Sequence, residues 1–98
     1  MKFHGFEIIY SGFQPSDRIR QMNRLLVERV VNLCPSDSQV TVSIDKLHDQ
    51  YGGLLRVNSA AGVFDVSCRT DSMESIAKIL TKGIMEKINV WKSARFVG

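Results

Sequence analysis

The chain has 98 residues and a formal charge of +3; 44% of its residues are hydrophobic and 23% are charged. These values predict one globular domain over residues 1–98, and the mild basic charge excludes a histone-like tail. Two cysteines, Cys34 and Cys68, are too few for a disulfide-rich scaffold. The sequence shows no signal peptide and no apolar run near the roughly 18 residues of a membrane span, so we expect a cytoplasmic protein with no membrane partner.

Residues 6–11 predict the first strand, because apolar and polar side chains alternate along them. Ser16 and Asp17 then offer an N-cap and a first-turn carboxylate, which predict a helix over about residues 17–33. Apolar residues recur along this segment at steps of three and four. We expect them to form its buried stripe: Ile19, Met22, Leu26, Val30 and Leu33.

Val27 and Val31 lie roughly opposite that stripe, on the same side as Arg20 and Arg24. Two valines on a side that should be solvated have two interpretations. They are either scattered surface residues or a contact surface for a partner or a second copy of the chain. The second interpretation predicts self-association through this helix.

Three further strands are predicted over residues 39–47, 55–57 and 63–69, because each segment alternates between apolar and polar side chains. Turns over residues 48–53 and 59–62 are expected to join them. The three strands share one polar and one apolar face. This pattern predicts an antiparallel sheet that is solvated on one side and covered on the other.

Asp71 and Glu74 have the spacing of a capping box and predict a second helix that runs to about residue 92, with residues 93–98 loose. The complete order is β-α-β-β-β-α. It predicts an α+β fold in which a four-stranded, mostly antiparallel sheet carries two helices packed on one face, since the helices are its only available cover.

The sequence contains no persuasive catalytic or metal-binding pattern. Gly52 and Gly53 lack the following helix and the lysine of a phosphate-binding loop, and no G-x-S-x-G segment occurs. His4 and His48 have no further ligands at metal-binding spacing. We therefore expect no enzyme activity, no metal, no cofactor and no small-molecule substrate.

Basic residues are the better signal. Two helices that cover the same sheet face lie side by side, so we expect their outward basic residues to converge on one cationic surface for a polyanion. These residues are Arg18, Arg20 and Arg24 in the first helix and Lys78, Lys82 and Lys92 in the second. The alternative is that they are ordinary solubilising side chains, diluted by Glu28, Glu74 and Glu86.

The order of elements resembles that of two families. The double-stranded RNA-binding domain shares α-β-β-β-α, but residues 71–74 (Asp-Ser-Met-Glu) stand where that family has a lysine cluster, and they would repel phosphate. The chain is more similar to the bacterial ribosome hibernation-promoting factors, also called ribosome-associated inhibitors or sigma-54 modulation proteins. Residues 55–58 (Leu-Arg-Val-Asn), a turn, a strand and residues 71–76 (Asp-Ser-Met-Glu-Ser-Ile) look like that family's L-x-V, turn, strand and D-M-Y-x-A-I-D.

This second resemblance covers nearly the whole chain, and Lys82 falls at the lysine of the family's K-L-x-R-Q segment. The chain departs from the family where Gly83 follows Lys82 and the arginine and glutamine of that segment are absent. Residues 12–14 (Gly-Phe-Gln) also lack the arginine of the family's Gly-Arg-Asn.

The resemblance implies a divergent, short-type hibernation factor that binds the small ribosomal subunit near the decoding channel and inhibits translation under stress. Residues of both helices are then implied to contact its 16S-type rRNA: Arg18, Arg20, Arg24, Lys78, Lys82 and Lys92. The alternative is a protein–protein interaction module that kept the fold and lost rRNA binding, with Val27 and Val31 as its contacts.

Overall fold

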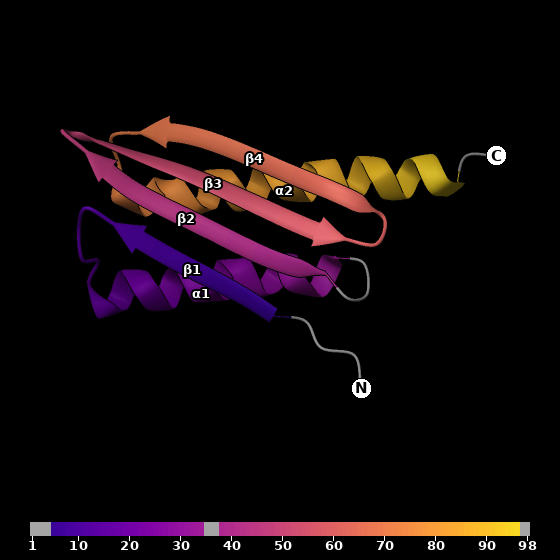
Figure 1. Cartoon of the computed structure of the whole chain (residues 1–98), viewed down its shortest axis with the longest axis horizontal. Helices are drawn as coiled ribbons and strands as arrows, with labels where there is room; N and C mark the ends of the chain where they lie inside the picture. Colours follow the sequence, from indigo (N-terminus) through magenta and orange to yellow (C-terminus); the bar gives the residue numbers. More distant parts are fainter. Residues whose placement is uncertain (1–4, 35–37, 97–98) are drawn as a thin grey trace.

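The structure, a computed structural model, describes residues 5–34 and 38–96. Its elements follow the predicted order β-α-β-β-β-α (Figure 1). They are β1 (Gly5–Ser11), α1 (Asp17–Leu33), β2 (Gln39–Leu47), β3 (Gln50–Ser59), β4 (Gly62–Thr70) and α2 (Met73–Phe96).

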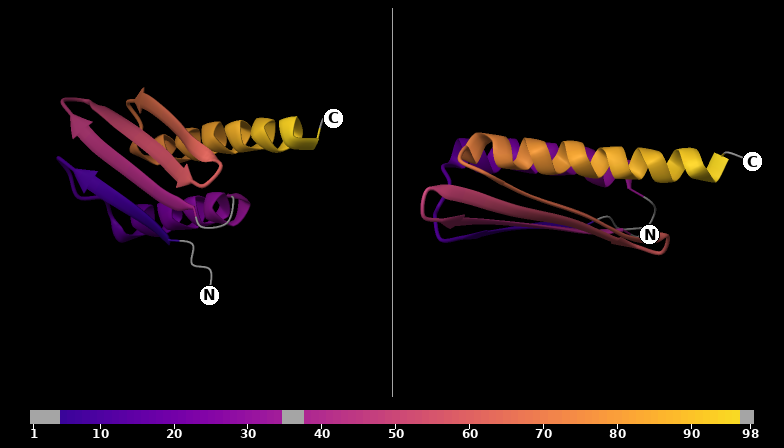
Figure 2. Two further views of the ribbon diagram at one scale, coloured as in Figure 1. Left: turned by 45° about the vertical axis from the view of Figure 1, so that its right-hand side comes forward. Right: turned by 90° about the horizontal axis from the view of Figure 1, so that it is seen from above.

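The four strands form one sheet in the order β1-β2-β3-β4. β1 and β2 are parallel, because α1 carries the chain back between them, whereas β2–β3 and β3–β4 are antiparallel pairs joined by short turns. Both helices lie on the same side of the sheet, as the edge-on view of Figure 2 shows. The predicted α+β fold with a mostly antiparallel sheet is therefore confirmed.

The core lies between the helices and the apolar side of the sheet. Val42 and Ile44 of β2 and Leu55 of β3 are buried, as their alternation predicted. They pack with α2, whose buried side chains recur at steps of three and four: Ile76, Leu80, Ile84 and Ile88. Neither described helix has the length and apolar character that crossing a bilayer requires.

The orientation of α1 differs from the prediction. Val27 and Val31 are 0% and 7% exposed, so the expectation that they lie on a solvated side is wrong. Their stripe faces the sheet beside β1, while Met22 and Leu26 are half-buried and Leu33 is exposed. Ile19 and Val30 of the expected stripe are buried as predicted, at 2% and 0% exposed. The buried side of α1 therefore combines these two residues with the valines, because the helix is rotated from the expected orientation.

Two other boundaries differ from the prediction. The turn between β2 and β3 is confined to His48 and Asp49, so Gly52 and Gly53 are strand residues. A side chain at Gly53 would collide with the core, because its Cβ would lie 2.7 Å from Leu80 Cδ1. The second helix extends to Phe96, beyond the expected end near residue 92, since no glycine or proline interrupts residues 93–96.

Candidate functional site

The candidate site lies where α1 and α2 run side by side in the same direction. Each helix returns antiparallel to the strand before it, and β1 and β4 point the same way, so both helices begin at the same end of the sheet (Figure 1). The Ser16 hydroxyl accepts a hydrogen bond from the Ile19 amide and caps α1. An ion pair of 2.7 Å between Arg18 Nη2 and Glu74 Oε1 joins the first turns.

The three predicted lysines of α2 lie on its solvent side and on its side nearest α1, whereas Lys87 lies on its β4 side. At 100° per residue, Lys78 and Lys92 fall close to the direction of Glu74, which contacts α1, and Lys82 points further outward. Lys78 and Lys82 are exposed and Lys92 is half-buried. Within the described residues, none of these three lysines forms an ion pair.

Lys92 is placed by its effect on Cys34, the residue that follows α1. Burial raises the pKa of the Cys34 thiol, and the ammonium group of Lys92 partly offsets this rise. Lys92 therefore lies near the end of α1, and the positive charges of α2 extend along most of the boundary between the two helices.

Arg29 is a basic residue that the sequence analysis missed. It follows Arg18 by 11 residues, about three helical turns, so it lies on the same side of α1, toward α2, and it is exposed. The 11-residue spacing between Arg18 and Arg29 could have shown from the sequence that the two arginines share a side of the helix. We call Arg18, Arg29, Lys78, Lys82 and Lys92 the cationic strip.

Arg20 and Arg24 do not join the cationic strip, so the expectation of one surface for all six predicted residues is wrong for these two. The Arg20 guanidinium carbon lies 5.5 Å from the ring centre of Tyr10, and that of Arg24 lies 5.8 Å from the ring of Phe6. Arg20 Nε also donates to the Pro15 carbonyl. Both arginines therefore lie over β1, beside a hollow of about 200 Å³ on the far side of α1 from α2.

The three glutamates affect the cationic strip unequally. Glu74 neutralises Arg18. Glu28 lies about 100° around α1 from Arg29, away from α2. Glu86 follows Lys82 by one turn and lines a groove on the β4 side of α2. The four remaining cations of the strip therefore keep a positive field between the helices.

The open face of the sheet offers no comparable surface. Arg56 and Asp65 face each other across β3 and β4 at 3.6 Å, and Asp45 lies beside Arg69, so charges of both signs alternate there. Among the described residues, no group of three or more His, Cys, Asp or Glu side chains is placed to hold a metal. A polyanion therefore has its best electrostatic match on the helical side.

No family model matches the chain, and no curated protein matches it in sequence. Its fold is similar to that of the Thermus thermophilus protein Y N-terminal domain, with a TM-score of 0.74 and 9% identity over 88% of this chain and 97% of that chain. It is also similar to a ribosomal subunit interface protein from Coxiella burnetii, with a TM-score of 0.71, 11% identity and the same coverage. The resemblance to the ribosome hibernation factors is thus confirmed at the level of the fold.

Proposed function

We propose that this chain is a ribosome-associated factor that binds rRNA of the small subunit near the decoding channel through the cationic strip, and so inhibits translation. One observation carries the proposal. The chain has the fold of a ribosomal subunit interface protein over 97% of that protein's length, and it gathers cations between the two helices of this fold.

The proposed mechanism requires binding and no bond chemistry. A rigid body held in an rRNA groove excludes mRNA and tRNA by occupying their place. Side chains cannot read the deep major groove of A-form RNA, so contacts to phosphates and 2′-hydroxyls would dominate. Lys78 and Lys82 suit such contacts, because they are exposed and their ammonium groups form no ion pair within the described residues.

The charge of the strip sets the expected salt dependence. Four of its cations are not neutralised by Glu74: Arg29, Lys78, Lys82 and Lys92. If each neutralises one phosphate, the logarithm of the association constant falls by about 2.8–3.6 per decade of salt. Between about 50 and 200 mM salt, this slope corresponds to a loss of roughly 50- to 150-fold in affinity.

Arg20 and Arg24 would make a second, separate contact with rRNA. They lie on the far side of α1, so they would contact a different phosphate run from the one that the cationic strip meets. Their guanidinium groups rest on the rings of Tyr10 and Phe6, which limits their mobility and lowers the entropy cost of binding. We expect their loss to weaken rRNA binding less than loss of the strip.

The proposal is tested by co-sedimentation with purified small ribosomal subunits at about 50 mM salt, where phosphate contacts are strong. Lys82→Glu should lower the bound fraction, and Lys78→Glu with Lys82→Glu should abolish it. Lys46→Glu is the matched control, because it makes the same charge change beside Tyr51 at the end of the sheet. No co-sedimentation of the unmodified chain, or equal losses for Lys46→Glu and Lys82→Glu, would contradict the proposal.

A translation assay separates binding from inhibition. Added to a reconstituted translation system, the unmodified chain should lower product yield in proportion to its occupancy of small subunits, and the double lysine variant should leave the yield unchanged. Binding without a loss of yield would place the site elsewhere on the ribosome and would overturn the inhibitory part of the proposal.

A further inference from the structure

The outer edge of β4 is the feature on which this inference rests. β4 is the last strand of the sheet and, among the described strands, pairs only with β3. Ser59 and Gly62 are partners across a two-residue turn, from which we infer a hydrogen-bonded pair there, and such pairs alternate along antiparallel strands. Val63, Asp65, Ser67 and Arg69 therefore direct their amide and carbonyl groups away from β3. A hydrogen bond of 2.6 Å from Lys87 Nζ to the Asp65 carbonyl agrees with this outward direction of the Asp65 backbone.

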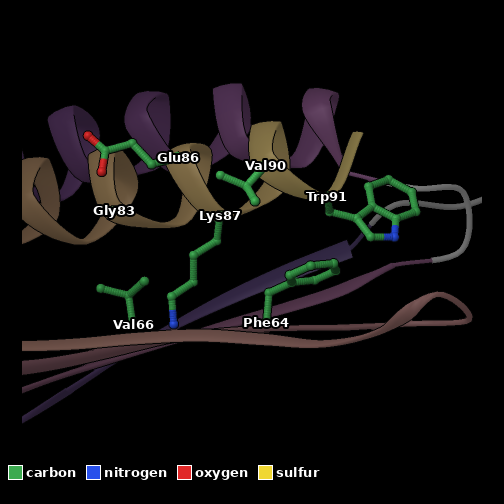
Figure 3. A pocket seen from close by; sticks show the side chains of 7 residues that line it. All are labelled: Phe64, Val66, Gly83, Glu86, Lys87, Val90 and Trp91. Carbon is green, nitrogen blue, oxygen red and sulfur yellow. The ribbon is translucent and has the colours of Figure 1, made fainter. Parts of the chain in front are cut away.

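An apolar groove of about 650 Å³ runs beside this edge, between β4 and α2 (Figure 3). It is lined mainly by Phe64, Val66, Gly83, Lys87, Val90 and Trp91. Val90 is 70% exposed, and Ile79 on the same side of α2 is 42% exposed. A free strand edge next to exposed apolar side chains is a surface suited to pairing with another strand.

The opposite edge of the sheet differs. β1 has seven residues, and the guanidinium groups of Arg20 and Arg24 lie over its aromatic side chains. β4 has nine residues and no proline, and Val63 near its start is 58% exposed. β4 is therefore the longer edge and has more exposed apolar surface, which makes it the more favourable edge for association.

We propose that β4 pairs antiparallel with β4 of a second copy of this chain, with Ser67 opposite Ser67 on the two-fold axis. The charge pattern of the strand selects this partner and this register. Antiparallel pairing about Ser67 places Asp65 directly opposite Arg69 of the second copy, and Arg69 opposite its Asp65. The strand is thus complementary to itself, and all three positions belong to the set whose backbone groups point away from β3.

The position of α2 fits the same arrangement. α2 packs across both β3 and β4, so it lies close to the boundary between these strands. In the dimer, the α2 helices of the two copies would be separated by two strand spacings, or about 9.4–9.8 Å. Packed helices lie about 8–10 Å apart, so the exposed sides of the two helices would meet and close the groove. A Cβ at Gly83 would lie 3.0 Å from Val66, so Gly83 lies near the axis and leaves room there.

Lys87 competes with this pairing. Its ammonium group occupies the Asp65 carbonyl, which the backbone amide of Arg69 in the second copy would take over in the dimer. A lysine on an edge strand is a common device against pairing, so we expect dimerisation to be reversible and to depend on concentration. Lys87→Met keeps the apolar stem and removes the competing group, and it should tighten the dimer.

The dimer leaves the cationic strip accessible. The groove lies on the β4 side of α2, whereas Lys78 and Lys92 lie toward α1. Dimerisation therefore does not depend on the proposed function, and it can be measured without ribosomes.

Sedimentation equilibrium of the purified chain tests the proposal. The unmodified chain should form a dimer, and Arg69→Asp should weaken it at least tenfold, because two Asp–Asp pairs then face each other across the axis. Asp65→Arg combined with Arg69→Asp should restore the dimer. Far-UV circular dichroism and thermal unfolding of each variant show whether its monomer is folded.

A disulfide trap tests the register independently. In a Cys34→Ser, Cys68→Ala background, Ser67→Cys should link two copies under mild oxidation, because residues of an antiparallel hydrogen-bonded pair have Cα atoms about 5.5 Å apart, near the usual disulfide value. Val63→Cys is the control, since Val63 does not face itself in this register. An unmodified chain that stays monomeric up to about 1 mM overturns the proposal. A dimer that is insensitive to Arg69→Asp, or that is not trapped through Ser67→Cys, also overturns it.

Discussion

The guanidinium group of Arg18 lies 2.7 Å from a carboxylate oxygen of Glu74, and this ion pair joins the first turn of α1 to that of α2. Both side chains remain largely exposed, at 74% and 57%, so the pair contributes little to the free energy of unfolding. Its larger effect is on charge. Glu74 removes one cation from the strip at the end where both helices begin.

The first prediction concerns Glu74→Gln. This change frees Arg18 for a phosphate contact, so the salt dependence of rRNA binding should steepen by about 0.7–0.9 per decade. Stability should fall by less than about 1 kcal/mol, because an exposed ion pair and one carboxylate near a helix N-terminus are lost. Glu28→Gln is the control, since it makes the same charge change away from α2. Equal slopes for the two variants would show that Arg18 lies outside the interface.

The second prediction concerns the orientation of α1. Val27→Asp places a carboxylate at a fully buried position and should lower the free energy of unfolding by more than about 3 kcal/mol. Leu25→Asp, at a side chain that is 54% exposed, should change it by less than about 0.5 kcal/mol. Urea denaturation followed by circular dichroism measures both. A stable Val27→Asp variant would show that the solvated side of α1 is the one that its sequence pattern first indicated.

The third prediction concerns the buried amide of Asn23. Its Nδ2 donates to the Tyr10 hydroxyl at 3.0 Å, whereas its Oδ1 has no hydrogen-bond partner within residues 5–34 and 38–96. Tyr10→Phe should destabilise the fold by about 1–3 kcal/mol, because the amide then loses its remaining partner. Asn23→Leu in the Tyr10→Phe background should recover part of this loss. A double-mutant cycle in urea measures the coupling, and additive effects would contradict the proposed interaction.

The fourth prediction compares two adjacent glycines of β3. Gly53→Ala places a Cβ 2.7 Å from Leu80 Cδ1 and 3.0 Å from Ile76 Cγ1, so it should cost about 1–3 kcal/mol through overpacking. Gly52→Ala meets the carboxylate of Asp45 at 2.9 Å, and this exposed side chain can rotate away. The midpoint temperature of thermal unfolding should therefore be much lower for Gly53→Ala than for Gly52→Ala. The reverse order would place Gly52 on the core side of the sheet.

The fifth prediction concerns the reactivity of Cys34. Burial raises its thiol pKa, so a smaller fraction is thiolate at neutral pH than for a free cysteine, and alkylation should be slow there and accelerate only at more alkaline pH. Lys92→Gln removes the charge that partly offsets this rise, so it should shift the rate profile further toward alkaline pH. Mass spectrometry of iodoacetamide labelling at several pH values measures the profile. A shift of the rate profile toward acidic pH in Lys92→Gln would contradict the conclusion that the charge of Lys92 lowers the pKa of Cys34.

The sequence alone predicted the order of elements, because the signals for each element are local. Alternation in β2, β3 and β4 identified the buried faces, and Ser16 and Asp71 marked the helix starts close to where they occur. The glycines of β3 were misplaced into a turn, since glycine is typical of turns. Gly53 pairs with Ile44 of β2 and Cys68 of β4, and the close approach of Leu80, a residue distant in sequence, leaves no room for a side chain there.

The candidate site was only partly predictable. Lys78 and Lys92 lie toward α1 as expected and Lys82 points further outward, but Arg20 and Arg24 turn toward β1, and Arg29 is the arginine of α1 that lies toward α2 with Arg18. Apolar residues spread over more than one side of α1, so periodicity alone does not say which of them meet the sheet. Asn23 makes this ambiguity worse, because its polar side chain is buried against Tyr10 and interrupts the stripe that packs on the sheet.

The sequence by itself therefore determined which segments form helices and strands and which side of the sheet is apolar, because backbone propensity and alternation act over a few residues. The tertiary structure decided the rotation of α1, the division of its arginines between β1 and α2, and the exposure of the β4 edge beside an apolar groove. Each of these depends on which distant surfaces meet. The rotation of a helix whose apolar residues spread over more than one side is set by its neighbours, here the sheet on one side and α2 on the other.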